Sequence, residues 1–163
     1  MHIGGFQKMT MLDYPGKVAC TIFTYGCNFR CPFCHNASLV TDKPEFFSED
    51  EVLSYLTKRA GVLDGVCISG GEPLLQSDIF EFMKKVKDKG LLVKLDTNGS
   101  FPEKLKYAMD EKLIDYVAMD IKNSKEKYAV TVGVDSFDIT PVEKSVQILL
   151  SGDIDFESRT TIT

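Results

Sequence analysis

The sequence predicts an α/β fold, a partial (β/α) TIM-like barrel of five to six parallel strands. Predicted strands alternate with predicted helices along the 163 residues, and this order implies a parallel sheet with helices outside it. Polar and glycine residues directly follow several strands, at the end where a (β/α) barrel builds its active site. The loop after the first strand is YGCNFRCPFCHN, residues 25–36, so the Gly-x-Gly-x-x-Gly signature of a dinucleotide-binding sheet is absent there.

The strands are predicted from short runs rich in β-branched and aromatic residues. They occupy residues 17–25, 65–69, 91–96, 114–121 and 153–163. Because these strands are too few to close a barrel, we expect the barrel to be open on one side.

Amphipathic stretches between the strands predict helices. The first, residues 48–60, opens with Ser48 and Glu51 in capping-box spacing. The second covers residues 77–90 and ends at a glycine, a residue type that favours a helix C-terminus. The polar segment 123–138 is interpreted either as a substrate-facing loop or as a solvated connection. Two further start signals combine an N-cap residue, a proline and a capping carboxylate: Ser100, Pro102 and Glu103, and then Thr140, Pro141 and Glu143.

Composition argues against several classes of function. Charged residues make up 26% of the chain and the formal net charge is −5, so there is no basic stripe of the kind that binds nucleic acid. No segment approaches the roughly 20 apolar residues that a membrane span needs, and the N-terminal residues lack the apolar core of a signal peptide. We therefore expect a cytoplasmic protein with no nucleic-acid partner and no membrane partner.

Three of the five cysteines, Cys27, Cys31 and Cys34, are crowded into the loop after the first strand. An odd number of thiols in a reducing compartment argues against a disulfide framework. The other two, Cys20 and Cys67, lie in predicted strands and are expected to be thiols of the core. The cysteine loop therefore indicates metal or redox chemistry.

Three thiolates suit an iron–sulfur cube that leaves one iron open to a substrate or cofactor. A four-ligand zinc site needs a further ligand, and His35 is poorly placed for this because it directly follows Cys34. A non-enzymatic zinc-binding module, built from the three cysteines and His35, remains the alternative.

Two motifs resemble those of a known family. The pattern Cys-x3-Cys-x-aromatic-Cys, with Phe33 as the aromatic residue, resembles the cluster motif of the radical S-adenosylmethionine (radical SAM) enzymes, and SGGEP at 69–73 resembles their second signature. Residues 12–36, DTNG at 96–99 and MDIK at 119–122 are similar to the activating enzymes of glycyl radical enzymes. The similarity is strongest to the activating protein of anaerobic ribonucleoside-triphosphate reductase, and next to that of pyruvate formate-lyase.

The resemblance implies cofactors and partners. It implies a [4Fe–4S] cluster on Cys27, Cys31 and Cys34, with S-adenosylmethionine (SAM) on the open iron as the source of a 5′-deoxyadenosyl radical. The implied substrate is a glycine Cα–H of a glycyl radical enzyme, with anaerobic ribonucleotide reductase as the first choice and pyruvate formate-lyase as the alternative. A flavodoxin- or ferredoxin-type protein would supply the electron.

The resemblance also implies a pocket for SAM, with no catalytic residue beyond the cofactors. Gly70 and Gly71 would let the backbone approach the methionine moiety, and Glu72 would accept a hydrogen bond from its ammonium group. The expected cofactor-binding residues are Phe33, Gly70, Gly71, Glu72, Asp96, Asn98, Asp120 and Lys122.

Charged residues at strand ends complete this expected pocket. Asp96 and Asp120 would bind the ribose, a cation or the ammonium group, whereas Lys122 shares the face of Asp120 and would pair with the methionine carboxylate. Simpler interpretations stay open: turn chemistry for Asp96 and for GGEP, and a local ion pair for Asp120 with Lys122.

One radical SAM domain is expected over residues 1–163. The families that the sequence resembles continue with a further helix and a sixth strand, whereas this sequence stops at Thr163 within a predicted strand. We therefore expect either a truncated or a minimal version of the domain, with the C-terminal strand and helix missing.

Overall fold

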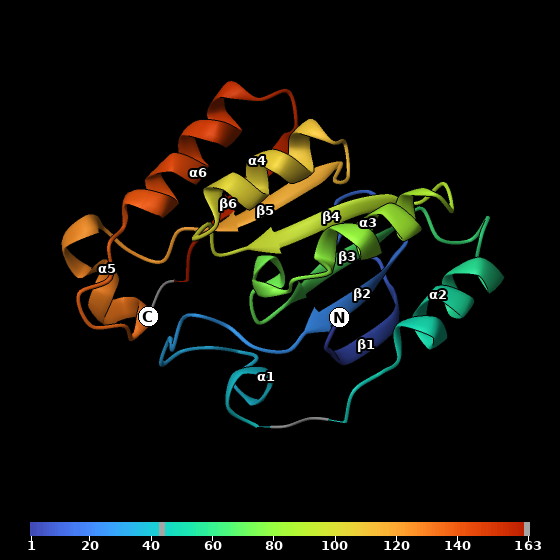
Figure 1. The fold of residues 1–163 in the computed structure, drawn as a ribbon, viewed down its shortest axis with the longest axis horizontal. Helices are drawn as coiled ribbons and strands as arrows, with labels where there is room; N and C mark the ends of the chain where they lie inside the picture. Colours follow the sequence, from blue (N-terminus) through green and yellow to red (C-terminus); the bar gives the residue numbers. More distant parts are fainter. Residues whose placement is uncertain (43–44, 162–163) are drawn as a thin grey trace.

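The computed structural model describes residues 1–42 and 45–161, which form a six-stranded sheet in the order β1-β2-β3-β4-β5-β6. β1 (Ile3–Thr10) is antiparallel to β2 (Ala19–Thr24), and each later strand is parallel to the one before it. The later strands are β3 (Gly65–Gly70), β4 (Leu92–Thr97), β5 (Tyr116–Asp120) and β6 (Asp155–Arg159). β1 and β6 form the two edges of the described sheet, so the barrel is open, as the sequence predicts (Figure 1).

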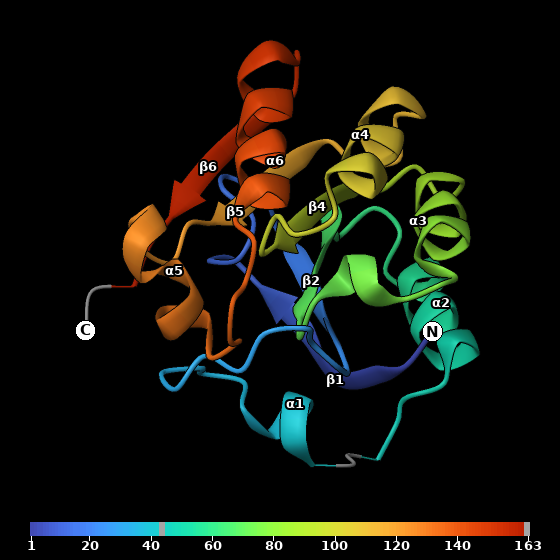
Figure 2. The same ribbon diagram turned by 60° about the vertical axis from the view of Figure 1, so that its left-hand side comes forward.

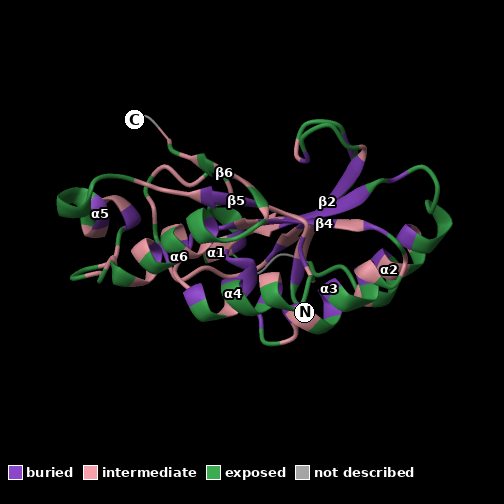
Figure 3. Ribbon diagram, turned by 90° about the horizontal axis from the view of Figure 1, so that it is seen from above, coloured by how far each residue is buried: buried purple, intermediate pink, exposed green. Residues whose placement is uncertain are grey.

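Helices cover one face of this sheet. α2 (Glu49–Lys58), α3 (Ile79–Lys87), α4 (Pro102–Asp110) and α6 (Thr140–Ser151) lie along the same side, as Figure 3 shows. α3 packs on β4, α2 packs on α3, and α4 packs on α6. Within the described residues, no helix is both long enough and apolar enough to cross a membrane.

Short elements occupy the loops that leave the carboxyl ends of the parallel strands. They are α1 (Ser38–Thr41) after β2, the 3₁₀ turn η1 (Pro73–Leu75) after β3, and α5 (Lys125–Val132) after β5. Figure 2 shows α1 and α5 on either side of the loop that follows β2. All three loops therefore meet at one end of the sheet.

Alternate strand residues point to opposite faces of the sheet, and this separates an apolar set from a polar set. Ile22, Ile68 and Leu95 belong to the buried core beneath the helices. Their sequence neighbours Ser69 and Asp96 point to the opposite, concave face and line a cavity there. The polar residues of the candidate site are thus a consequence of strand periodicity.

The predicted parallel strands are confirmed, with small shifts at their ends. The last predicted range, 153–163, includes residues 162 and 163, which lie outside the described residues. The predicted capping box is also confirmed, since Ser48 Oγ accepts from Glu51 N at 3.1 Å and Glu51 Oε2 accepts from Ser48 N at 3.3 Å.

Two predicted helix caps are wrong by one position. Neither Ser100 nor Thr140 is an N-cap, because α4 and α6 each begin one residue away from the position that the sequence signals. Their hydroxyls bond loop side chains instead: Ser100 Oγ donates to Asn98 Oδ1 at 2.6 Å, and Thr140 Oγ1 donates to Asp138 Oδ1 at 2.7 Å. At both positions the hydroxyl bonds a neighbouring side chain and does not cap the helix.

The sequence did not predict β1 or α5. β1 reads IGGFQKMT, and its two glycines and polar residues hide the strand signal because they have low strand propensity. α5 lies in the polar segment 123–138 and buries only Tyr128 and Val132. That segment is therefore partly helical, which neither of the two predicted interpretations included.

Candidate active site

A cavity of about 400 Å³ opens at the carboxyl ends of the parallel strands. This volume is in the range that small-molecule ligands occupy. Its walls come from the cysteine loop (residues 25–36), from the ends of β3, β4 and β5, and from the end of β6. Its lining residues are Cys27, Phe29, Cys31, Phe33, Cys34, His35, Asn36, Ser69, Gly70, Gly71, Asp96, Thr97, Asn98, Asp120, Lys122, Arg159, Thr160 and Thr161. Every site residue predicted from the sequence lines this cavity except Glu72.

The cysteine loop is anchored on α5 and on the segment that follows it. Phe29 is only 3% exposed and packs edge-on against Phe137 and Tyr128, with ring centroids 5.0 and 6.5 Å away. The backbone N–H of Arg30 donates to the carbonyl of Val132 at 2.7 Å. Phe29, midway between Cys27 and Cys31, is thus fixed in the protein interior.

Gly133 allows this close approach. Its φ of +65° lies in the left-handed region, and a Cβ placed on it would lie 2.3 Å from the carbonyl oxygen of Arg30. No side chain fits at that distance, because real Cβ atoms do not approach backbone oxygen so closely. A glycine is therefore required where α5 meets the cysteine loop.

The three thiols of the loop are free and half-buried. Cys27 Sγ accepts a hydrogen bond from the backbone N–H of Phe29 at 3.3 Å and another from Asn98 Nδ2 at 3.8 Å. Burial raises the pKa of the Cys27 thiol to about 11 and also raises that of Cys31. A positively charged partner such as iron would reverse this effect, because coordination stabilises the thiolate.

The donor set of the loop fits a cluster with three protein ligands. Cys20 and Cys67 are buried in β2 and β3, as predicted, which leaves three cysteines at the cavity. Across residues 1–42 and 45–161, no three His, Cys, Asp or Glu side chains stand close enough to hold a single metal ion. Three thiols that face one cavity match an iron–sulfur cube whose fourth iron stays open.

The two glycines of SGGEP let this turn lie against the strand that leads into the cysteine loop. Gly71 N donates to the carbonyl of Thr24 at 2.8 Å, and Glu72 N donates to that of Gly26 at 2.8 Å. A Cβ on Gly71 would lie 2.0 Å from the Gly26 oxygen, and one on Gly70, whose φ is +109°, would lie 2.4 Å from Thr24 N. Both glycines also line the cavity, where their bare backbone faces the space for a ligand.

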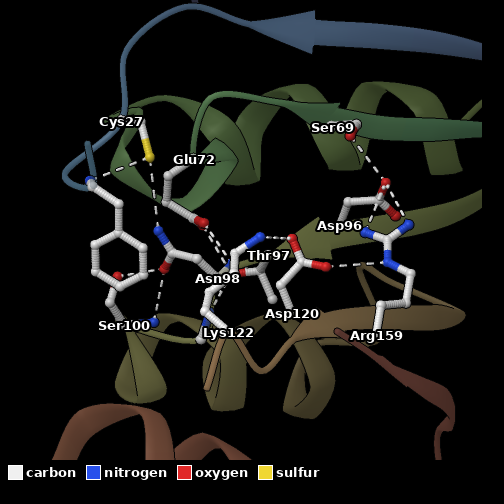
Figure 4. A network of polar contacts seen from close by, with 12 residues as sticks. Cys27, Ser69, Glu72, Asp96, Thr97, Asn98, Ser100, Asp120, Lys122 and Arg159 are labelled. Atoms are coloured by element: carbon white, nitrogen blue, oxygen red, sulfur yellow. Dashed lines mark hydrogen bonds and ion pairs between the residues drawn. The ribbon is translucent and has the colours of Figure 1, made fainter. Parts of the chain in front are cut away.

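Glu72 lies inside the wall of the cavity, with no exposed surface. Its Oε1 accepts from Leu74 N at 3.1 Å and from Thr97 Oγ1 at 2.8 Å, and its Oε2 accepts from Asn98 N at 2.8 Å (Figure 4). Burial raises the pKa of this carboxyl to about 7, although the three hydrogen bonds oppose the rise. The predicted contact with a methionine ammonium group would require some of these internal bonds to open.

A buried lysine supports the carboxylate at the end of β4. Lys94 is 1% exposed and its Nζ lies 2.5 Å from Asp96 Oδ1, while Ser69 Oγ donates to Asp96 Oδ2 at 2.9 Å. The turn interpretation of Asp96 is therefore incomplete, because its carboxylate faces the concave side of the sheet and meets residues from β3 and β4.

Arg159 links two strand ends that the sequence treats separately. Its Nη2 lies 3.3 Å from Asp96 Oδ2 and its Nε lies 3.3 Å from Asp120 Oδ1 (Figure 4). The other oxygen of Asp120, Oδ2, pairs with Lys122 Nζ at 2.7 Å. Sequence reasoning missed Arg159, Ser69 and Lys94. The last predicted strand, residues 153–163, extends past Arg159 and so did not mark it as a strand-end residue, whereas β6 ends at Arg159 in the structure and brings it to the other strand ends.

Comparison with known proteins identifies the family. Residues 21–152 match the family model described as the Radical SAM superfamily. The chain belongs to the radical SAM superfamily. Enzymes of this superfamily use a [4Fe–4S] cluster and SAM, and the three cysteines and the SGGEP turn of this radical SAM chain lie together at its cavity.

Relatives of this radical SAM protein include glycyl-radical enzyme activating enzymes. A protein of Methanocaldococcus jannaschii, provisionally named as one, is 39% identical over 77% of this chain and 52% of its own length. The pyruvate formate-lyase-activating enzyme of Listeria monocytogenes is 33% identical over 74% of this chain and 53% of its own. The chain spans about half the length of these relatives.

A solved structure shares the fold. Native anSMEcpe with bound AdoMet aligns with a TM-score of 0.61 and 23% identity, over 82% of this chain and 41% of that one. This likeness supports the assignment of an open, mostly parallel (β/α) barrel.

Proposed function

We propose that this protein holds a [4Fe–4S] cluster on Cys27, Cys31 and Cys34 and uses SAM to place a glycyl radical on a partner enzyme. The observation that supports the proposal is that three free thiols, the SGGEP glycines and the charged strand ends line one cavity. When bound, the cluster supplies one electron that cleaves SAM to methionine and a 5′-deoxyadenosyl radical, which takes a hydrogen atom from a glycine Cα. The residues of this chain contribute position, charge and exclusion of water.

The strand ends offer complementary charges for SAM, whose methionine part carries an ammonium and a carboxylate group. Lys122 fits the carboxylate, and Asp96 and Asp120 fit the ammonium group or the ribose hydroxyls. Phe33, from the cysteine loop, and Asn98, from the end of β4, line the same cavity and complete the proposed set. Because Lys122 and Asp120 already pair at 2.7 Å, SAM would enter a site whose charges are ordered beforehand, which lowers the cost of binding.

The proposed partner is a protein. A glycine Cα–H can react only if it is held in close contact with the radical while water is excluded, and an open barrel leaves a side by which a peptide segment can enter. Anaerobic ribonucleotide reductase is the first choice, because residues 6–18 and CPFCHN at 31–36 resemble its activating protein most. Pyruvate formate-lyase is the alternative, supported by the Listeria relative.

Three further points belong to this proposal. Residues 1–163 act as one radical SAM domain, because a single sheet joins all of the described strands. A flavodoxin- or ferredoxin-type protein donates the electron. The protein works in the cytoplasm, where thiols stay reduced and available for the cluster.

The test is anaerobic reconstitution followed by radical detection. The protein should turn brown with about four irons per chain, as a cube requires, and should convert SAM to 5′-deoxyadenosine when reduced. Incubation with the reductase should give the doublet of a glycyl radical in electron paramagnetic resonance. A colourless protein with one zinc would favour the zinc-binding module, and a doublet on the lyase alone would change the partner.

Cysteine variants supply the control. Cys34→Ala removes a proposed ligand and should abolish both cluster and cleavage, whereas Cys20→Ala changes a buried thiol of β2 and should keep both. Full iron content in Cys34→Ala would contradict the ligand assignment.

A further inference from the structure

The side chain of Asn98 connects the end of β4 to the cysteine loop. Its Nδ2 lies 3.8 Å from Cys27 Sγ and 3.0 Å from Asn28 Oδ1, and its Oδ1 accepts from Ser100 N at 3.0 Å and from Ser100 Oγ at 2.6 Å (Figure 4). A backbone N–H can only donate, so the oxygen of the amide must face Ser100. The NH₂ group therefore faces the sulfur.

The backbone of Asn98 is fixed from the other side. Glu72, which has no exposed surface, accepts from Asn98 N at 2.8 Å and from the hydroxyl of Thr97 at 2.8 Å. Asn98 itself is 6% exposed. The amide thus has little freedom to leave the sulfur, because the buried Glu72 holds its backbone and the half-buried Ser100 holds its oxygen.

Cys27 differs from the other two cysteines of the loop in its hydrogen bonds. Its sulfur accepts from Asn98 Nδ2 and also from Phe29 N at 3.3 Å. Among the hydrogen bonds of the described residues, none has Cys31 Sγ or Cys34 Sγ as an acceptor. Donors to a ligand sulfur stabilise the more negative, reduced form of a cluster and so raise its reduction potential.

We infer that Asn98 sets the reduction potential of the bound cluster through an N–H···S hydrogen bond to Cys27, with Glu72 as the residue that positions it. This inference rests on the proposed function, because it requires a cluster on Cys27. It assigns to Asn98 a role toward the cluster, in addition to any contact with SAM.

The experiment is a redox titration of the reconstituted protein, followed by electron paramagnetic resonance, on the wild type and two variants. Asn98→Leu keeps approximate size and removes the donor. Asn98→Asp keeps the oxygen that Ser100 N and Oγ bond, so the turn is preserved, but it replaces the donor with a negative charge. At a fixed potential, the ratio of reduced to oxidised cluster should fall about fivefold in the leucine variant and further in the aspartate variant.

Ser100→Ala is the matched control. It removes the hydroxyl contact of Asn98 while Ser100 N still orients the amide oxygen, and it does not touch the sulfur. Its potential should equal that of the wild type, and a fall as large as that of Asn98→Leu would overturn the assignment to the donor.

The outcomes separate this inference from the proposed function. A wild type that binds no cluster refutes the proposed function. Wild-type potentials in both Asn98 variants, with clusters intact, refute this inference alone. If both variants lose the cluster while Ser100→Ala keeps it, Asn98 is needed for assembly and the tuning role is wrong. If only the leucine variant loses the cluster, the reduction potential of the aspartate variant decides: a lower potential than that of the wild type supports the inference, and an equal one refutes it.

Discussion

Raising the pH from 5 to 8 should weaken the fold through the carboxyl group of Glu72. Its burial raises the pKa from the ordinary 4.5 to about 7. Hydrogen bonds from Asn98, Thr97 and Leu74 oppose this rise, and the negative charge of Asp120 adds to it. The folded state therefore holds this proton more tightly than the unfolded state does. The stabilisation is complete below pH 4.5 and is lost as the pH rises through about 7.

The size of the effect follows from the two pKa values. A rise from 4.5 to about 7 corresponds to about 3 kcal/mol of unfolding free energy that disappears across this interval. Because the carboxyl has no exposed surface, solvent screens it little, and no discount for screening is applied to this free energy.

Urea unfolding of the reduced, metal-free protein at a series of pH values measures this loss. Glu72→Gln stays neutral at every pH and has a similar shape, so the difference in stability between wild type and variant isolates this one group. Between pH 5 and 8 the unfolding free energy of the wild type should fall by up to about 2.7 kcal/mol relative to that of Glu72→Gln, because only the two pH units below the folded pKa of about 7 contribute. Glu103→Gln, which removes an exposed carboxylate from α4, is the matched control. A wild-type-minus-Gln difference that is flat across this range would refute the reasoning.

Three further predictions follow from close approaches and charge. Gly71→Ala should lower the thermal midpoint far more than Gly90→Ala, because Gly90, although left-handed at φ +76°, has nothing within 4 Å of its Cβ position; equal losses would contradict the close approach. Gly133→Ala should displace the cysteine loop from α5, so that a chelator removes iron several times faster than from Gly90→Ala. Lys122→Met should weaken SAM binding about tenfold with full iron content, as measured by equilibrium dialysis, and an unchanged affinity would remove Lys122 from the site.

Much of the fold could be predicted because its signals are local. The apolar runs of β2 to β5 and the capping box at Ser48 depend on neighbouring residues alone. β1 could not be predicted, because its glycines and polar side chains are compatible with a strand only through pairing with β2. α5 was missed for a similar reason, since its helix depends on burying Tyr128 beside the aromatic rings of the cysteine loop and its surroundings.

The residues of the site could be predicted, but several of their contacts could not. The carboxyl ends of parallel strands meet at one end of the sheet, so Asp96 and Asp120 had to lie near each other. The bridge by Arg159 and the support by Lys94 depend on strand register and on sheet curvature, which the sequence does not state. Nor does it state that the carboxylate of Glu72 turns inward, because GGEP is equally compatible with an outward side chain.

The inward turn of Glu72 changes how the SGGEP motif acts. The backbone N–H of Glu72 donates to the carbonyl of Gly26 at the start of the cysteine loop, and the side chain of Glu72 accepts from Thr97 and Asn98 at the end of β4. Asn98 Nδ2 in turn donates to Cys27 Sγ. These contacts form a closed ring in which each loop limits the freedom of the next. A substitution in the motif should therefore disturb the cysteines as well as the ligand. Loss of SAM binding in such a variant is evidence for direct contact only when the spectrum of its cluster is unchanged.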